Sequence, residues 1–303
     1  MNLRIGTRAS PLALWQARHV ADRLRAAHAG LDIELVEIET AGDQVRDVPL
    51  PQIGGEGVFT KAIQQAVLAR RVDVAVHSLK DLPTIPVAGL VLAAVPPRGP
   101  SGDVLVSKRH HPFAKLPPGA TLATSSQRRK AQVLHRRPDL KLIDIRGNVE
   151  TRLRKLTEQN LEGLILAQAG LERLGLTGAI TEVLDPAWML PAVGQGALGL
   201  ECRDDDESTR GLLQTIDDAG THAAVLAERA FLRGLGGGCL LPIGAATTLQ
   251  DSALTLRGAV TAPDGRQRLE DQVAGPSAQG EALGATLATA LLARGARALL
   301  GLT

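Results

Sequence analysis

The stretch Val72 to Pro83, VDVAVHSLKDLP, indicates the class of fold to which this chain belongs. Its first half is a run of small apolar residues broken only by Asp73, which is typical of a strand covered on both faces in a parallel α/β sheet. The run ends in four polar side chains: His77, Ser78, Lys80 and Asp81. Ligands of open α/β sheets bind at the carboxyl ends of strands, so these residues are candidates for a binding or catalytic site. The alternative is an ordinary loop, because loops after strands are usually polar.

The composition limits the classes of protein to consider. A chain of 303 residues, 44% hydrophobic and 22% charged, is long enough for two or three domains with hydrophobic cores. The net charge of +2 and the 2% of aromatic residues argue against a nucleic-acid-binding protein. No apolar run reaches the roughly eighteen residues of a membrane span, and the N-terminus lacks the pattern of a signal peptide. We therefore expect a cytoplasmic protein that binds neither nucleic acid nor membrane.

The two cysteines lie in different settings. Cys202 ends a segment rich in glycine and apolar residues, so we expect it to be a packed small hydrophobe. Cys239 follows three glycines, which let the backbone approach a ligand closely and leave the thiol on an unencumbered loop. The sequence therefore predicts a chemical role for Cys239, and both thiols should be free in a reducing compartment.

Arg8 and Ser10 lie at a second turn between a strand and a helix. Leu3 to Thr7 is predicted to be a strand, and Ser10 followed by Pro11 is typical of a helix start. The free N–H groups at a helix N-terminus favour an anion, so this turn is a candidate anion site. The alternative is plain helix capping by Ser10 and a surface charge on Arg8.

A second α/β unit is predicted after the proline- and glycine-rich stretch from Pro96 to Pro100, which marks a domain boundary. Three of its predicted strands end near arginines: Arg128, Arg129, Arg146, Arg152 and Arg173. The planar fork of arginine matches a carboxylate, so a crevice lined by these side chains would bind a ligand with several carboxylates. The alternative is that they lie on solvated helix faces.

The last eighty or so residues predict a small α+β domain. Ala245 to Val260 indicates two strands, Asp264-Gly265 a hairpin turn, and Gln279 to Leu292 a helix.

Together these segments resemble the porphobilinogen deaminase family. The motifs that carry the resemblance are TRASPLA (7–13), VHSLKDLP (76–83), TSS (124–126), RGN (146–148), LPAVGQG (190–196) and GGC (237–239). The resemblance implies two α/β domains like those of periplasmic binding proteins or transferrin lobes, and a small α+β C-terminal domain. It implies domain 1 at 1–96 and 197–215, domain 2 at 101–191 and domain 3 at 219–303.

The resemblance also implies an activity. The family is a transferase of porphyrin, tetrapyrrole and heme biosynthesis that deaminates four porphobilinogen units and joins them head to tail into hydroxymethylbilane. The product grows on a dipyrromethane cofactor bound by a thioether to a cysteine, which corresponds to Cys239. Asp81 corresponds to the catalytic aspartate, whose carboxylate would stabilise positive charge on the pyrrole and mediate proton transfers. No metal is implied, and we expect a monomer.

The pyrroles carry acetate and propionate groups, which need cationic and hydrogen-bonding ligands. By resemblance the carboxylate ligands of cofactor and substrate are Arg8, Ser10, Ser78, Lys80, Thr124, Ser125, Ser126, Arg128, Arg129, Arg146, Gly147, Arg152, Arg173 and Gln195.

The glycine-rich loop before Phe59 departs from the family pattern. Gln52 and Glu56 stand where other members carry lysines, which argues against carboxylate binding by this loop. Gly55 and Phe59 are retained, so we expect a mobile lid.

Two other functions would account for part of the sequence. A non-catalytic bilobal anion-binding protein would explain the arginines at strand ends, but neither Asp81 beside Lys80 nor the thiol of Cys239. A nucleic-acid-binding protein would use the basic clusters 128–130 and 135–137, but the near-neutral charge and few aromatics argue against it.

Overall fold

The computed structural model describes residues 2–40, 42, 57–238 and 241–302. The chain divides into two compact units, Met1–Gly99 with Ala197–His222 and Pro100–Gly196 with Ala223–Thr303. No helix among the described residues is both long and apolar enough to cross a membrane.

The first unit is built on a five-stranded sheet in the order β2-β1-β3-β10-β4. Its strands are β1 (Asn2–Thr7), β2 (Asp32–Glu37), β3 (Val74–Ser78), β4 (Leu90–Ala94) and β10 (Leu198–Arg203). Its helices are α1 (Pro11–Ala27), α3 (Lys61–Leu68), α7 (Glu207–Gln214) and the 3-10 turn η2 (Leu79–Asp81). β1 is parallel to β2 and β3, whereas β10 runs antiparallel to β3 and β4, so the sheet is mixed rather than purely parallel.

β3 is covered on both faces, as its sequence predicts. Val74 and Val76 belong to the core that includes Ala17 and Val20 of α1. Ala75, which points to the opposite face, belongs to the core that includes Ile63 of α3. A strand buried on both faces needs the continuous apolar run that the sequence shows, and the polar residues begin where that cover ends.

The second unit contains a second mixed five-stranded sheet in the order β7-β6-β8-β5-β9. Its strands are β5 (Asp103–Ser107), β6 (Thr121–Ala123), β7 (Lys141–Ile143), β8 (Gly163–Ala167) and β9 (Glu182–Val183). Its helices are α4 (Gln127–Arg136), α5 (Val149–Glu158), α6 (Gln168–Arg173) and the 3-10 turns η3 (Phe113–Lys115) and η4 (Thr177–Ala179). β6 is parallel to β7 and β8, so the carboxyl ends of these three strands meet at one edge.

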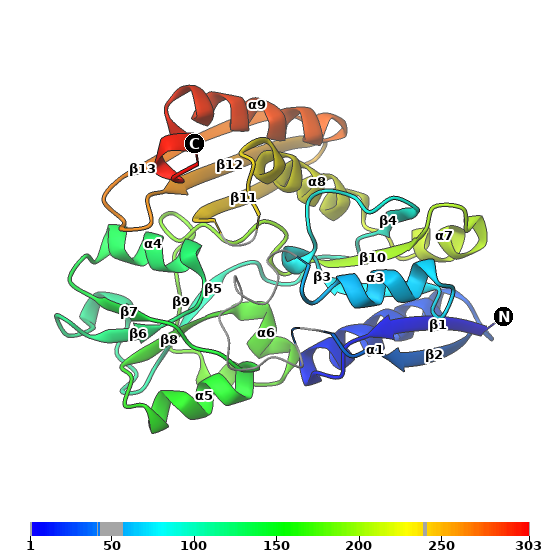
Figure 1. The fold of residues 1–303 in the computed structure, drawn as a ribbon, viewed down its shortest axis with the longest axis horizontal. Coiled ribbons are helices and arrows are strands. Elements are labelled where there is room, and N and C mark those ends of the chain that lie inside the picture. The colour runs from blue at the N-terminus through cyan, green and yellow to red at the C-terminus, as the bar shows by residue number, and fades with distance from the viewer. Residues whose placement is uncertain (1, 41, 43–56, 239–240, 303) are drawn as a thin grey trace. The chain divides into compact units, whose positions relative to one another are not determined.

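The C-terminal part of this unit is a three-stranded antiparallel sheet with helices packed on it (Figure 1). Its strands are β11 (Ile243–Gln250), β12 (Ala253–Thr261) and β13 (Arg268–Pro276). The helices are α8 (Ala219–Gly234), α9 (Gly280–Ala293), α10 (Ala296–Leu299) and the 3-10 turn η5 (Ser277–Gln279). Gly265 in the turn before β13 has φ of +76°, which glycine adopts without strain. Two α/β domains and a small α+β C-terminal domain are thus confirmed, while their exact boundaries stay a prediction.

Candidate functional site

A pocket of about 80 Å³ opens in the first unit where β1 and β3 end and α1 begins. Its described lining residues come from these three elements, from η2 and from the start of α3: Arg8, Ser10, Leu12, Ala13, Gln16, Phe59, Thr60, Ile63, Val76, His77, Ser78 and Asp81. Six of the residues singled out from the sequence are therefore brought together here: Arg8, Ser10, Phe59, His77, Ser78 and Asp81. Lys80 is half-buried and is not among the described lining residues.

Ser10 caps the helix that forms one wall of the pocket. Its backbone is extended, and its Oγ accepts a hydrogen bond from the Ala13 N–H at 3.3 Å. Pro11 follows at the first helical position, as the sequence predicts. The capping function of Ser10 is confirmed, and its function as a carboxylate ligand stays a prediction.

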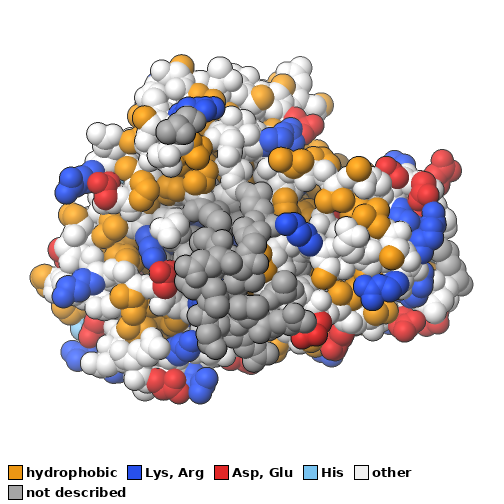
Figure 2. Space-filling model, viewed as in Figure 1, with side chains coloured by type: hydrophobic (Ala, Val, Ile, Leu, Met, Phe, Trp, Pro, Cys, Tyr) orange, Lys and Arg blue, Asp and Glu red, His pale blue; other side chains and the backbone are white. Residues whose placement is uncertain are grey.

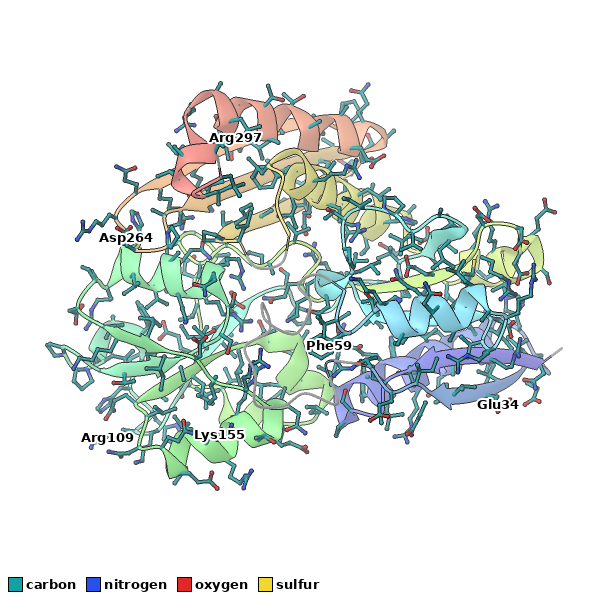
Figure 3. All side chains as sticks on the ribbon, in the orientation of Figure 1. Glu34, Phe59, Arg109, Lys155, Asp264 and Arg297 are labelled. Atoms are coloured by element: carbon teal, nitrogen blue, oxygen red, sulfur yellow. The ribbon has the colours of Figure 1, made fainter. Side chains whose placement is uncertain are left out.

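Arg8 and Phe59 contact each other at the pocket. The guanidinium carbon of Arg8 lies 4.2 Å from the centroid of the Phe59 ring, which is a cation–π contact. Phe59, labelled in Figure 3, comes just before α3. The other predicted lid residue, Gly55, and the substituted positions Gln52 and Glu56 lie outside the described residues.

The end of β3 presents hydroxyl and carboxylate groups to the same pocket. Gln16 donates from Nε2 to Ser78 Oγ at 2.8 Å and accepts from that hydroxyl through Oε1 at 3.2 Å. Asp81 is exposed, and no hydrogen bond or ion pair joins its carboxylate to another described residue. The fully buried Leu79, whose N–H donates to the Ala197 carbonyl at 3.0 Å, fixes the turn that carries Asp81.

His77 is turned into the protein rather than left open. Its side chain is 2% exposed, and Nε2 lies 3.1 Å from Glu201 Oε2 on the neighbouring strand β10. Gln64 of α3 donates to the same carboxylate oxygen at 2.9 Å.

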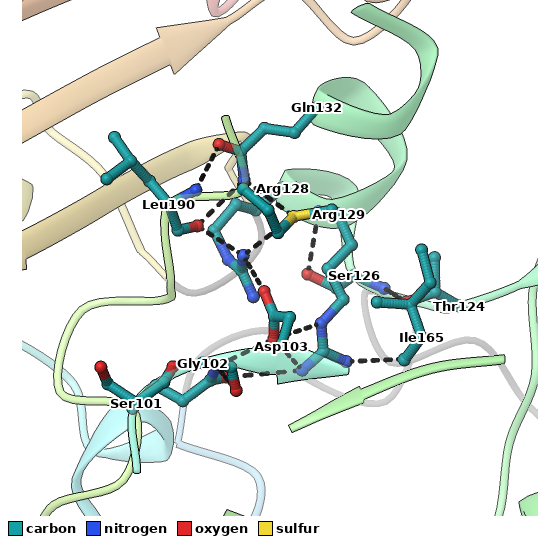
Figure 4. A network of polar contacts seen from close by, with 12 residues as sticks. Ser101, Gly102, Asp103, Thr124, Ser126, Arg128, Arg129, Gln132, Ile165 and Leu190 are labelled. Atoms are coloured by element: carbon teal, nitrogen blue, oxygen red, sulfur yellow. Dashed lines mark hydrogen bonds and ion pairs between the residues drawn. The ribbon is translucent and has the colours of Figure 1, made fainter. Parts of the chain in front are cut away.

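A buried polar network occupies the second unit, where α4 meets β5 (Figure 4). Asp103 is fully buried and binds two arginines from the first turn of α4. Its Oδ2 lies 2.6 Å from Arg128 Nη1, and its Oδ1 lies 2.9 Å from Nε and 2.8 Å from Nη2 of Arg129. Although burial alone would raise the pKa of Asp103, the charges of Arg128 and Arg129 hold it well below its usual range.

The two arginines differ in the donors that they have left. Arg129 also donates to the Ile165 carbonyl at 3.0 Å and to Gln195 Oε1 at 3.4 Å, so all three of its nitrogens are engaged. Arg128 donates to the Leu190 carbonyl at 2.6 Å, again through Nη1. Its Nε is buried and has no acceptor among the described residues. A buried donor left unpaired costs roughly 1–3 kcal/mol, so this atom marks a place for an acceptor from outside the chain.

The alternative, that these arginines lie on solvated helix faces, is wrong for Arg128 and Arg129, which are 3% and 6% exposed. Arg146 and Arg152 are half-buried, and Arg152 Nε donates to the Gly147 carbonyl at 2.8 Å. Arg173 donates to the Gly196 carbonyl at 2.6 Å, and burial lowers its pKa. The predicted arginines thus differ widely in exposure.

The hydroxyls of the TSS motif shape the turn before α4. Thr124 Oγ1 accepts from the Ser126 N–H at 3.3 Å, and Ser125 Oγ accepts from the Ile145 N–H at 3.1 Å. Ser126 caps α4 by accepting from the Arg129 N–H at 3.4 Å. Each hydroxyl therefore has a structural partner, and ligand binding by these residues stays a prediction.

The cysteine expectations have separate outcomes. Cys202 is fully buried and free, as predicted, and burial, with a smaller contribution from Asp206, raises the pKa of its thiol to about 11. Cys239, the predicted attachment site, lies outside the described residues.

Sequence reasoning missed Asp103 and Gln16. Asp103 follows a proline- and glycine-rich stretch and looks like a loop residue. The sequence gives only a weak indication of a function for Gln16, which is a polar residue on the same buried face of α1 as Ala17 and Val20.

A pocket lined by an arginine, hydroxyls and an open carboxylate, together with a buried arginine cluster, defines an α/β protein that binds small organic anions. Residues 3–211 match the family model described as porphobilinogen deaminase, dipyromethane cofactor binding domain, and residues 222–293 match porphobilinogen deaminase, C-terminal domain. The chain therefore belongs to the porphobilinogen deaminase family, as the sequence motifs predict, and the non-catalytic alternative is not supported.

Individual relatives agree with the family models. The chain is 51% identical to porphobilinogen deaminase of Syntrophotalea carbinolica over 97% of this chain and 93% of that one. It is 50% identical to porphobilinogen deaminase of Trichlorobacter lovleyi over 98% and 95%, respectively. Among solved structures, it has a TM-score of 0.40 and 18% identity to the periplasmic aliphatic sulphonate binding protein SsuA of Escherichia coli, over 77% of this chain and 70% of that one.

Proposed function

We propose that the pocket around Asp81 is where this enzyme deaminates porphobilinogen and joins the units. The chain is a transferase of tetrapyrrole and heme biosynthesis that forms hydroxymethylbilane from four porphobilinogen units. The observation that carries the proposal is the exposed Asp81 carboxylate, which lines a pocket with Arg8 and Ser10 and has no partner among the described residues.

Asp81 is suited to act on a substrate that becomes positively charged. Loss of ammonia from the aminomethyl group of porphobilinogen leaves a cation delocalised onto the pyrrole nitrogen. A carboxylate held on a fixed turn stabilises that charge better than water, which must reorient. The same oxygens can accept the proton of the pyrrole nitrogen or of the carbon at which coupling occurs. Because Leu79 anchors the turn, the carboxylate is in place before the charge forms.

Arg8 and Ser10 would hold substrate carboxylates on the other side of the pocket. Arg8 supplies a guanidinium, and the N-terminus of α1 supplies a positive dipole end. Phe59 restricts the Arg8 guanidinium by stacking against it. The fixed guanidinium would orient porphobilinogen with its aminomethyl carbon toward Asp81. Ser78, fixed by Gln16, would add a hydroxyl donor.

The chain carries the family's dipyrromethane cofactor binding domain. When bound, the dipyrromethane supplies the primer to which porphobilinogen units are added. The residues fit such a polycarboxylate, because the buried Nε of Arg128 has no acceptor among the described residues. We propose that Cys239 forms the thioether and that the carboxylates are held by Lys80, Thr124, Ser125, Ser126, Arg128, Arg129, Arg146, Gly147, Arg152, Arg173 and Gln195.

We further propose that the enzyme is a cytoplasmic monomer of three domains that does not bind nucleic acid. On the face in Figure 2, Lys and Arg side chains lie scattered among Asp and Glu side chains rather than gathered in one basic surface. A free, buried Cys202 is consistent with a reducing compartment. Light scattering of the purified protein at several concentrations tests the monomer.

The intact mass of the purified protein tests the covalent part of the proposal. We expect the wild-type chain to carry the added mass of two pyrrole units. Cys239→Ser should lose this adduct completely. Cys202→Ser is the matched control and should keep it, because Cys202 is buried. An active wild-type enzyme without the adduct, or an adduct on Cys239→Ser, would contradict the proposal.

A further inference from the structure

We propose that Asp103 is a positioning residue of the carboxylate site, which holds Arg128 by one corner of its guanidinium and leaves the opposite edge to a ligand carboxylate. The inference rests on the proposed function, because it takes Arg128 as a ligand of a pyrrole carboxylate. It assigns a role to a buried acid that is not among the residues lining the pocket around Asp81.

The N–H donors of Arg128 are used unevenly. A guanidinium has five N–H groups, arranged as a planar fork. Nη1 of Arg128 donates to Asp103 Oδ2 at 2.6 Å and to the Leu190 carbonyl at 2.6 Å, and it lies 3.8 Å from Met189 Sδ. The buried Nε has no acceptor among the described residues. Among the described residues, all acceptors of Arg128 therefore lie at the Nη1 corner, and the edge formed by Nε and Nη2 has none.

The edge of Arg128 formed by Nε and Nη2 is suited to a carboxylate. Arg4 in the first unit shows the geometry, since its Nε and Nη2 bind Asp73 Oδ2 and Oδ1 at 3.0 and 2.8 Å. Such paired bonds match two N–H groups to two carboxylate oxygens. Arg128 leaves free the edge that Arg4 uses, so an incoming carboxylate can bind it in the same two-bonded way.

The buried cluster of Asp103, Arg128 and Arg129 carries a net positive charge. Arg128 and Arg129 are adjacent, buried cations that repel each other, and the Asp103 carboxylate lies between them (Figure 4). One anion against two cations leaves one positive charge, which a single ligand carboxylate would neutralise. Without Asp103, two buried charges would lack compensation, and the guanidiniums would move apart or toward water.

Asp103 is itself held in place by Gln195. Gln195 donates from Nε2 to Asp103 Oδ1 at 2.8 Å and to the Ser101 carbonyl at 2.7 Å. Its Oε1 accepts from Arg129. Gln195 therefore fixes the Asp103 carboxylate, and through it the two arginines, to the backbone before β5.

The test compares Asp103→Asn with Asp73→Asn, measured in the full-length protein. Asp73 is the matched control because it also contacts two arginines, Arg4 and Arg203, but lies in the first unit and lines no part of the pocket. Three quantities are measured: the fraction of chains with the cofactor mass, KM and kcat for porphobilinogen, and stability to urea.

We expect Asp103→Asn to reduce the cofactor-bearing fraction about tenfold if the ligand carboxylate belongs to the cofactor. If the carboxylate belongs to the substrate, the fraction should be unchanged and KM should rise about tenfold at constant kcat. Asp73→Asn should lose stability without either change. Normal loading and normal KM in Asp103→Asn, or the same defects in Asp73→Asn at equal stability, would overturn the proposal.

Two further variants separate the possible failures. Arg128→Gln should show the defect of Asp103→Asn or a larger one; if it loads and binds normally, the ligand function of Arg128 fails, and the inference with it. A defective Arg128→Gln beside a normal Asp103→Asn would refute only the positioning function. If Asp103→Asn does not fold, Gln195→Leu replaces it, because this variant keeps the charges of Asp103, Arg128 and Arg129. It should show a smaller defect in cofactor loading or KM. Normal loading and normal KM in Gln195→Leu would count against the proposal.

Discussion

Asp81 in the first unit and Asp103 in the second unit have the same side chain in opposite environments. Asp81 is exposed at the edge of a pocket, and no described residue binds its carboxylate. Asp103 is fully buried between two arginines and a glutamine. An exposed carboxylate has little desolvation cost and is available to a substrate, whereas a buried one persists only if paired. The exposed Asp81 is therefore suited to act on a substrate, whereas the buried Asp103 is suited to hold other side chains in place.

Removal of the Asp81 carboxylate tests the difference between the two aspartates with the largest expected effect. Asp81→Ala should lower kcat about 10²–10⁴-fold, because both charge stabilisation and proton transfer are lost. Its free energy of unfolding should change by less than about 0.5 kcal/mol, because the side chain is exposed and no described residue binds it. Steady-state turnover and urea denaturation measure the two quantities. Undiminished turnover would refute the assigned function.

Removal of the Asp103 carboxylate should lower stability in addition to its effect on ligand binding. The pKa of Asp103 is lowered in the folded protein, so its ionised form stabilises the fold above the unfolded pKa of about 3.9. We expect Asp103→Ala to lower the free energy of unfolding at pH 7 by about 3–5 kcal/mol.

The pH dependence of the free energy of unfolding shows whether Asp103→Ala loses stability through the missing charge or only through the cavity that it leaves. The contribution of Asp103 is lost as the pH falls through the folded pKa, so the difference between wild type and Asp103→Ala should shrink below about pH 4. Denaturation at several pH values measures it, with the exposed Asp22→Ala as a control that should change little. A difference constant with pH would mean that charge is not involved.

Two variants of Ser10, with smaller expected effects, distinguish helix capping from ligand binding. Ser10→Ala should destabilise the fold by about 1 kcal/mol, because α1 loses its N-cap. Ser10→Asp keeps a capping oxygen and should retain stability, but its negative charge beside Arg8 should raise KM for the anionic substrate. Equal KM values for Ser10→Asp and wild type would show that Ser10 is only a cap.

The smallest effect is expected at Cys202. With a thiol pKa raised to about 11 and no exposed surface, it should not react with iodoacetamide at pH 8 in the folded protein. Peptide mapping after labelling in native buffer checks this, and labelling in urea is the positive control. Rapid native labelling of Cys202 would contradict its buried position.

Much of the first site was predictable from local sequence. β3 is an apolar run followed by polar residues, and Ser10-Pro11 starts a helix. The carboxyl end of β3 and the N-terminus of α1 could therefore be placed without tertiary information. The two turns meet because β1 and β3 are parallel neighbours, which brings Arg8, Ser10 and Ser78 to one edge. The amide of Gln16 could not be assigned to Ser78, because the partners are separated by 62 residues.

The sequence by itself determined the strand and turn at Asp81, the capped start of α1, the arginines at strand ends and, through its motifs, the family. Only the tertiary structure decided that Arg128 and Arg129 are buried, because their acceptors come from β5, β8 and the segment 190–195, which local pattern cannot bring together. It likewise decided that β10 enters the first sheet antiparallel between β3 and β4. Sequence periodicity reports which face of an element is apolar, whereas the partner of a buried charge is fixed by packing between distant segments.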